Sequence, residues 1–209
     1  MPRPRSLTPT AVAAATVAVI DRDGLDALTM RTVAKELGMA TMSLYRYVSD
    51  RAELEALVVD HVLAGIDLSP PTGADWRARV TVLIERMRDA VRAHSGMVPL
   101  MVRHRHSSPA SLHWIEATLT VLTDAGFRGV DRAIAQRTVV GFLIGALQSE
   151  YYGPLSGTGT ATMARLSAEE FPTLTETAAD AREIPPDEEF RRGLDIVLRG
   201  LVPGGGEVL

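Results

Sequence analysis

The sequence predicts an all-α protein with a small N-terminal head and a larger helical body. Apolar residues recur at intervals of three and four along most of the chain, and no stretch shows the strict alternation of a half-buried strand. Capping residues, prolines and glycines stand where these apolar stripes begin and end. A hydrophobic content of 46% and a charged content of 23% in 209 residues suit one or two domains with a buried core.

The first helix of the head is expected after Thr8. Threonine is a good helix N-cap, and Pro9 suits the first helical position because that position needs no N–H. Residues 11–23 place apolar side chains on one face, and Gly24 is the expected end of the helix. These signals predict a complete amphipathic helix at the start of the head.

Two short helices joined by a tight turn are expected next. Thr29 caps the first of them, and Gly38 closes it in the left-handed conformation that a sharp exit requires. The second is predicted over residues 41–48, where Leu44 and Val48 lie four residues apart and anchor it to the core. Two short helices with such a turn, and with a polar outer face on the second, predict a helix-turn-helix that reads double-stranded DNA.

The outer face of the second short helix carries side chains suited to DNA. Arg46 can pair with both acceptors of a guanine, and Met42 can touch a thymine methyl group. Arg31 and Arg51 stand at the starts of the flanking helices, where contacts to the phosphate backbone position a protein. The expected DNA-binding residues are Arg31, Thr41, Met42, Ser43, Tyr45, Arg46, Tyr47 and Arg51.

Other side chains of the head can be explained without any contact to DNA. Lys35 and Glu36 fit a solvated helix face better than base contacts, and packing against the next helix is an equal alternative for Tyr45. Three packed helices without any DNA function are disfavoured, because the turn, the anchors and the polar face occur together. The net charge of the chain is −4. Residues 1–51 carry a net charge of +2 and the rest of the chain −6, so only the head has a net positive charge of the kind that attracts DNA.

The body is predicted to begin with a fourth helix, which opens at Asp50-x-x-Glu53 like a capping box. Residues 67–73 are rich in proline and glycine and favour a boundary. The DNA-binding helix-turn-helix domain itself is expected over residues 1–50, and residues 51–209 are assigned to the body.

Helical stripes continue through the body. They run over residues 76–91 and 108–126, and Pro172 and Pro186 are expected to begin the last two helices. Residues 131–152 are apolar on more than one face. Such a helix must be buried both against its own core and against something else.

The stretch from Leu28 to Arg51 resembles the signature of TetR-type repressors, above all in Ser43-Leu44-Tyr45-Arg46-Tyr47-Val48 and the helix-capping Asp50. The body is similar to the tetracycline-repressor branch in Trp76, in Gly126-Phe127 and in Phe190-x-x-Gly193-Leu194. The resemblance implies an all-helical homodimeric transcriptional regulator, with repression as the expected effect. It also implies that the dimer binds a palindromic operator and leaves it when a small-molecule effector enters the body.

A homodimer is also expected because one isolated head contacts too few bases for useful specificity. The expected interface is formed by residues 131–152 and 186–201, and Gly141 and Gly145 would allow a close helix crossing. The resemblance implies that these two segments of each copy form a four-helix bundle. The alternative is that both helices serve only the core of one chain.

The body, residues 51–209, is thus expected to be a ligand-binding and dimerisation domain with an apolar effector pocket. The effector itself is unknown, and the end of the fourth helix, residues 64–66, lacks the histidine that a tetracycline site would need. Plain core packing is the alternative for the methionines and aromatic residues. The expected lining residues are Met87, His94, Met97, Met101, His113, Trp114, Phe142, Gln148 and Tyr151.

Catalysis, metal binding and cofactors are not expected. The chain has no cysteine. His104 and His106, with His113, could suggest a metal site, but Arg103 and Arg105 stand beside the first two and repel cations, so a solvated basic loop is expected instead. Residues 153–160 are rich in glycine but lack the lysine of a phosphate loop, and they read as a linker. No nucleophile and base stand together, so the chain is not expected to be an enzyme.

No apolar stretch reaches the length of a membrane span, so we expect a cytoplasmic protein without a membrane partner. The remaining alternative for function is a structural DNA-associated protein that uses the same head without any effector.

Overall fold

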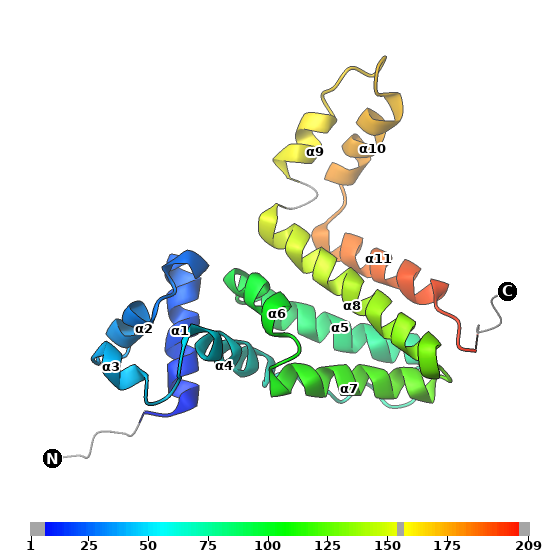
Figure 1. The fold of residues 1–209 in the computed structure, drawn as a ribbon. Coiled ribbons are helices and arrows are strands. Elements are labelled where there is room, and N and C mark those ends of the chain that lie inside the picture. The colour runs from blue at the N-terminus through cyan, green and yellow to red at the C-terminus, as the bar shows by residue number, and fades with distance from the viewer. Residues whose placement is uncertain (1–6, 154–156, 205–209) are drawn as a thin grey trace. The chain divides into compact units, whose positions relative to one another are not determined.

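The fold is all-helical, as the sequence predicts. A computed structural model describes residues 7–153 and 157–204, and this part of the chain holds helices and turns without a strand (Figure 1). The chain forms two compact units. Unit 1 comprises Met1–Thr72 and Val82–Thr120, and unit 2 comprises Gly73–Thr81 and Val121–Leu209.

Unit 1 contains the helix-turn-helix. Its helices are α1 (Pro9–Asp23), the short η1 (Leu25–Ala27), α2 (Met30–Glu36), α3 (Thr41–Leu44), α4 (Arg51–Leu63), most of α5 (Trp76–Arg92), η2 (Ser95–Met97), α6 (Val98–His104) and most of α7 (Pro109–Asp124). Unit 2 contains the remaining turns of α5 and α7 together with α8 (Gly129–Tyr152), α9 (Thr158–Met163), α10 (Pro172–Arg182) and α11 (Pro186–Gly200).

The predicted start and end of the first helix are confirmed. The Thr8 hydroxyl accepts the backbone N–H of Ala11 at 3.2 Å, and Pro9 is the first residue of α1. Gly24 follows the helix with a φ of 82°, a conformation that a Cβ would strain.

The helix-turn-helix also begins and turns where the sequence predicts. The Thr29 hydroxyl accepts the N–H of Thr32 at 3.0 Å, and Gly38 takes the left-handed conformation with a φ of 65°. Leu44 and Val48 are both buried, so the two predicted anchors hold this part of the chain.

The predicted length of the third helix is wrong. The α-helix spans Thr41–Leu44, and residues 45–47 form a turn, whereas the sequence predicts a helix over residues 41–48. The N–H groups of Arg46 and Tyr47 bond to carbonyls three residues earlier, at 3.4 and 2.9 Å. These tighter bonds replace the α-helical pattern in the last turn.

The cap of α4 differs in one detail from a full capping box. The Asp50 carboxylate accepts the N–H of Glu53 at 2.8 Å, but the Glu53 carboxylate accepts the N–H of Ser49 at 2.6 Å and not that of Asp50. The Ser49 N–H holds the pKa of Glu53 below its ordinary value. The predicted start of the fourth helix is therefore confirmed.

In unit 2, α8 packs against α11. The rings of Phe142 and Phe190 lie 5.4 Å apart, and a Cβ placed on Gly193 would come within 2.9 Å of the Phe142 ring. Pro172 and Pro186 begin α10 and α11 as predicted. The predicted linker over residues 153–160 is wrong at its end, because α9 already begins at Thr158; residues 154–156 lie outside the described residues.

Candidate nucleic-acid interface

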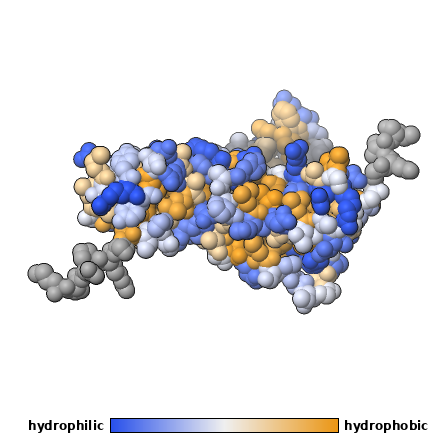
Figure 2. All heavy atoms as spheres, turned by 60° about the horizontal axis from the view of Figure 1, so that its bottom comes forward, coloured by the Kyte–Doolittle hydropathy of each residue, from blue (hydrophilic) through white to orange (hydrophobic). Residues whose placement is uncertain are grey.

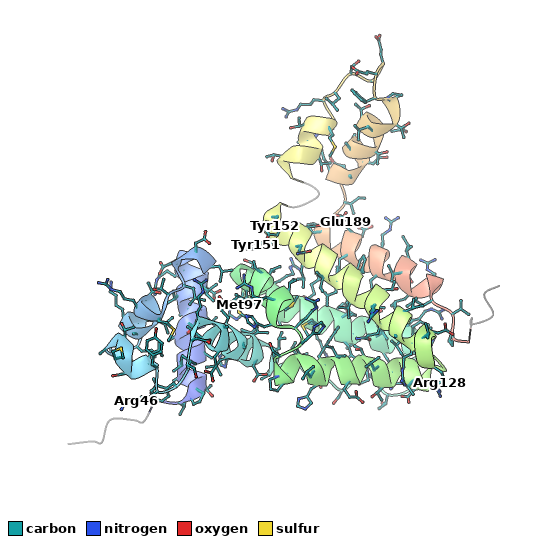
Figure 3. All side chains as sticks on the ribbon, viewed as in Figure 1. Arg46, Met97, Arg128, Tyr151, Tyr152 and Glu189 are labelled. Atoms are coloured by element: carbon teal, nitrogen blue, oxygen red, sulfur yellow. The ribbon has the colours of Figure 1, made fainter. Side chains whose placement is uncertain are left out.

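The α3 turn exposes a row of side chains on one side of unit 1. Met42 is 77% exposed, and Tyr45 is exposed as well. Arg46, also exposed, is labelled in Figure 3. Thr41, Ser43 and Tyr47 are half-buried. Because Leu44 and Val48 hold this segment to the core, its other side chains form an exposed surface. That surface combines apolar area with a guanidinium and hydroxyl groups, a combination that suits base edges and phosphates.

Arg31 lies on the neighbouring helix α2 and is exposed. Together with Lys35 and the turn formed by residues 38–41, it lines a concavity of about 450 Å³. One wall of this hollow is the first helix of the motif, and the other is the segment that leads into α3.

Arg51 has a partner inside the protein. Its Nε donates to the Glu55 carboxylate at 2.8 Å, one turn along α4. The side chain of Glu55 is only 4% exposed, and it also accepts Nη1 of Arg103 at 2.7 Å and lies 3.0 Å from Nε2 of His104. Burial raises the pKa of Glu55, but the donors from Arg51, His104 and Arg103 together outweigh burial, and the net shift is downward.

A second carboxylate of α4 holds the start of α7. Asp60 accepts the hydroxyl of Ser108 at 2.9 Å and the N–H of Ala110 at 2.7 Å. The helix that follows the helix-turn-helix is thus fastened to α6 through Glu55 and to α7 through Asp60. Sequence reasoning missed both contacts; only the spacing of four between Arg51 and Glu55 was visible as a signal.

Six of the expected effector-binding residues belong to unit 1. The Nε1 of Trp114 donates to the carbonyl of Leu83 at 2.9 Å, and Nδ1 of His94 lies 2.7 Å from the Asp21 carboxylate. His113 is exposed on α7. The apolar members of the set are buried in the core: Met87, Met97, Met101 and Trp114.

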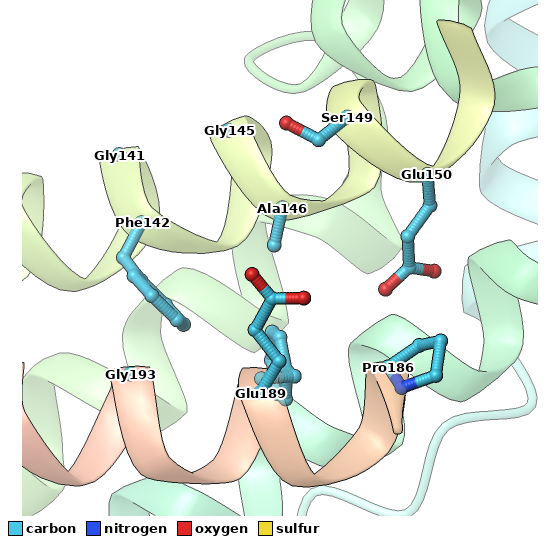
Figure 4. A pocket seen from close by; sticks show the side chains of 10 residues that line it. Gly141, Phe142, Gly145, Ala146, Ser149, Glu150, Pro186, Glu189 and Gly193 are labelled. Carbon is cyan, nitrogen blue, oxygen red and sulfur yellow. The ribbon is translucent and has the colours of Figure 1, made fainter. Parts of the chain in front are cut away.

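The other three expected effector-binding residues belong to unit 2 and lie on α8. Phe142, Gln148 and Tyr151 are half-buried, and the ring of Tyr151 packs edge-on against that of Tyr152 at 4.8 Å. Phe142 reaches from α8 toward Gly193 of α11 (Figure 4).

A groove of about 400 Å³ runs between α8 and α11. Figure 4 shows the Glu150 carboxylate at one end of it, the Phe142 ring toward the other, and the Glu189 carboxylate between them. Gly141 and Gly145 are exposed, and a Cβ at either position would meet open space. The lining residues are Gly141, Phe142, Gly145, Ala146, Ser149, Glu150, Pro186, Glu189, Phe190 and Gly193.

Large apolar side chains also lie exposed on α8 and α11, with Val130 73%, Ile134 56% and Ile196 68% exposed. Scattered hydrophobic residues are normal on a protein surface, and Figure 2 shows several between hydrophilic ones on the face in view. The spacing of four between Val130 and Ile134 matters more, because it puts both on one face of α8. Within the described residues, no helix is both long and apolar enough to cross a membrane.

Comparison with known proteins gives two family matches. The family described as "Bacterial regulatory proteins, tetR family" matches residues 12–56, and the family described as "Tetracyclin repressor-like, C-terminal domain" matches residues 69–203. The second match alone covers more than half of the chain.

Two curated relatives are similar in sequence. The HTH-type transcriptional repressor DrrR1 of Streptomyces coeruleorubidus is 32% identical over 152 residues, which cover 72% of this chain but only 56% of DrrR1. The tetracycline repressor protein class A from transposon 1721, of Escherichia coli, is 30% identical over 201 residues, which cover 93% of this chain and 90% of that repressor.

Among solved structures, apo ActR from Streptomyces coelicolor superposes with a TM-score of 0.84 at 26% identity, covering 98% of this chain and 99% of ActR. ActR is a TetR family protein that has also been solved in complex with actinorhodin.

Proposed function

The chain belongs to the tetR family of bacterial regulatory proteins, and from this premise we propose how it acts as a DNA-binding transcriptional regulator. Two copies bind one palindromic operator, each placing the N-terminal part of α3 in the major groove. Arg46 pairs with a guanine and Met42 contacts a thymine methyl group, while Thr41, Ser43, Tyr45 and Tyr47 bond to bases and phosphates. Repression is the expected effect on transcription.

The observation that carries this proposal is the exposed row formed by Met42 of α3 and by the turn of residues 45–47 that follows it. Met42, Tyr45 and Arg46 are exposed, whereas Leu44 and Val48, between and beside them, are buried. Within the described residues, the exposed Met42 and Arg46 are not buried by the core that Leu44 and Val48 join. They fit the groove of a DNA duplex, where apolar contact and bidentate hydrogen bonds read the sequence.

Operator binding is tested with a fluorescently labelled palindrome taken from the DNA upstream of the protein's own gene. We expect binding by the dimer that weakens steeply as salt concentration rises, because bound arginine and lysine side chains release counterions from the phosphates. A scrambled duplex of the same length and composition is the control. Equal binding to the palindrome and to the scrambled duplex would contradict operator recognition.

The dimer is proposed to form through residues 131–152 and 186–201. Exposed Ile134 and Ile196 support this interface, as do the open glycine positions Gly141 and Gly145 of α8. Glycine allows two helix backbones to approach closely, and in the described part of the chain no atom lies within 4 Å of a Cβ placed at either position. Burying this face against its copy would form a four-helix bundle.

An apolar or amphipathic small molecule is proposed to act as effector in the body, residues 51–209, and residues 1–50 to act as the DNA-binding domain. The complex of ActR with actinorhodin supports a ligand-responsive body. The effector must bind the state that is released from DNA more tightly than the operator-bound state, since only differential affinity shifts an equilibrium. The ligand-lining residues proposed from the sequence remain Met87, His94, Met97, Met101, His113, Trp114, Phe142, Gln148 and Tyr151.

Effector response is tested by titrating actinorhodin, tetracycline and a cell extract into the protein–operator complex. We expect one of the three to release the labelled operator, and mass spectrometry of the purified protein to identify the retained molecule. An operator complex that no extract fraction releases, and protein that retains no small molecule, would favour a regulator without an effector.

Two further properties follow from a regulatory role. The relatives are transcriptional regulators, and we propose that this chain likewise has no catalytic activity. A protein that binds operators works beside the bacterial chromosome, so we propose a cytoplasmic location.

A further inference from the structure

Lys35 is the only lysine in the 209 residues of the chain. It lies on α2 and is exposed, one helical turn after Arg31, so both side chains share one face of the helix. From the sequence, Lys35 reads as part of a solvated face. The surroundings of its ammonium group suggest a more specific role.

The cations of the head differ in whether a carboxylate already neutralises them. Arg22 lies 2.9 Å from both Asp23 and Glu36, and these two carboxylates raise its pKa further above its ordinary value. Within the part of the chain that the structure describes, Lys35 contacts no carboxylate. Its neighbour Glu36 is engaged by Arg22, so the acidic group closest in sequence is already paired.

Arg31 and Arg46 are also without a carboxylate partner in the described part of the head. Arg51, by contrast, donates to Glu55. Among the described cations of the head, Arg31 and Lys35 on α2 and Arg46 in the turn after α3 are therefore left to pair with an outside ligand.

Lys35 and Arg31 stand together in the concavity of about 450 Å³ that the turn of residues 38–41 closes on its other side. Thr41, the first residue of α3, belongs to the same lining. In a helix-turn-helix the first helix crosses the DNA backbone while the second enters the major groove. A hollow between these helices with two unpaired cations thus lies where the edge of the groove carries phosphodiester groups.

We propose that Lys35 and Arg31 bind a backbone phosphodiester of the operator in this concavity, with the Lys35 ammonium as a phosphate contact that adds affinity and not sequence preference. The proposal rests on the proposed function, since it assumes an operator complex. A free ammonium is a mobile point charge, which suits a phosphate oxygen better than a base edge.

The test measures operator affinity of the full-length protein at several salt concentrations for wild type, Lys35→Gln and Lys35→Arg. Each phosphate contact adds about 0.9 to the slope of log K against log salt concentration, so Lys35→Gln should lower the slope by about 1.8 in a dimer. At about 0.15 M salt this corresponds to roughly 30-fold weaker binding. Lys35→Arg should keep the slope, and the ratio of operator to scrambled-duplex affinity should be the same for all three.

The matched control is Arg22→Gln, which removes a cation from the same head that is already neutralised. Its slope should equal that of the wild type. A Lys35→Gln slope equal to that of wild type overturns the inference while the operator complex itself stands. Absence of any wild-type operator complex would remove the proposed function and this inference together.

The single lysine allows an independent measurement. Acetylation of the side-chain amine by an N-hydroxysuccinimide ester, followed by mass spectrometry, reports on Lys35 alone among the lysines. Saturating operator DNA should slow the acetylation of Lys35. As a control, a scrambled duplex at a concentration too low for binding should leave the acetylation rate unchanged. Equal acetylation rates with and without saturating operator would contradict the phosphate contact.

Discussion

The Nε2 of His104 lies 3.0 Å from a carboxylate oxygen of Glu55, which is almost fully buried on α4. The same oxygen accepts Nη1 of Arg103 at 2.7 Å, and Arg51 contacts the other one. Three side chains from two helices therefore converge on one acceptor. This cluster connects α4, the helix that follows the DNA-reading motif, to α6. Its loss should therefore lower the free energy of unfolding.

Glu55→Gln should lower the free energy of unfolding by about 1–3 kcal/mol, the usual worth of a hydrogen bond to a charged group whose partners are left unsatisfied. Urea unfolding followed by circular dichroism measures it. Glu188→Gln is the matched control, because among the described residues Glu188 pairs with exposed Arg192 alone and its loss should change stability by about 0.5 kcal/mol or less. Equal effects of the two substitutions would refute a structural role for the buried cluster.

Stability should also depend on pH through Glu55. Its pKa is lowered in the folded protein, so its contribution is fully present above the ordinary glutamate pKa of about 4.3. The contribution is lost as the pH falls through the lowered folded pKa. The stability of wild type should therefore drop more steeply on acidification than that of Glu55→Gln, and parallel curves would contradict this assignment.

Asp60→Ala should lower the free energy of unfolding by about 1–2 kcal/mol. Its carboxylate accepts the Ala110 N–H and the Ser108 hydroxyl, and it acts as an N-cap of α7 supplied from another helix. Thermal unfolding measures the loss. Asp180→Ala, on the exposed side of α10, serves as the control and should be nearly neutral.

Gly193→Ala should destabilise the packing of α8 on α11 by about 1–3 kcal/mol, because the new methyl group would lie 2.9 Å from the ring of Phe142. Gly200→Ala, on the same helix, meets nothing within 4 Å and should be neutral or slightly stabilising. Finding both variants equally stable would show that the Phe142 ring moves aside freely.

The dimer proposal is tested by Gly141→Arg. A long charged side chain in place of an open glycine on α8 should prevent a close helix crossing and shift the protein to monomer in analytical ultracentrifugation. Gly159→Arg, at another exposed glycine with open space around it, should leave the dimer intact. Dimeric Gly141→Arg protein would place the interface elsewhere.

The features that the sequence predicts best are helix caps, because each depends on residues close together in the chain. Thr8, Thr29 and Asp50 act on N–H groups three residues away, so their caps could be read directly from the chain. The end of α3 was missed because apolar spacing does not distinguish an α-helix from a tightened last turn. Residues 45–47 keep the anchors Leu44 and Val48 in place in either geometry.

Contacts between residues far apart in the chain were beyond prediction. Glu55 reads as one more charge on an amphipathic helix, and its partners Arg103 and His104 lie 48 and 49 residues away. The sequence places Arg51 at the phosphate backbone as a free cation. In the structure Glu55 already neutralises it, so the head offers one unpaired positive charge fewer. Whether Arg51 also contacts DNA remains a prediction.

The most direct test of operator reading by α3 compares Arg46→Ala with Arg22→Ala in binding to the labelled palindrome and to palindromes with single base changes. Losing a bidentate guanine contact in both copies should weaken specific binding by about 1–3 kcal/mol per half-site and abolish discrimination at one base position, while the dimer persists. Arg22→Ala should discriminate like wild type, because its charge is already paired. If Arg46→Ala retains the full discrimination of wild type at every position, α3 does not read the operator through Arg46, and the account of how this chain recognises DNA is wrong.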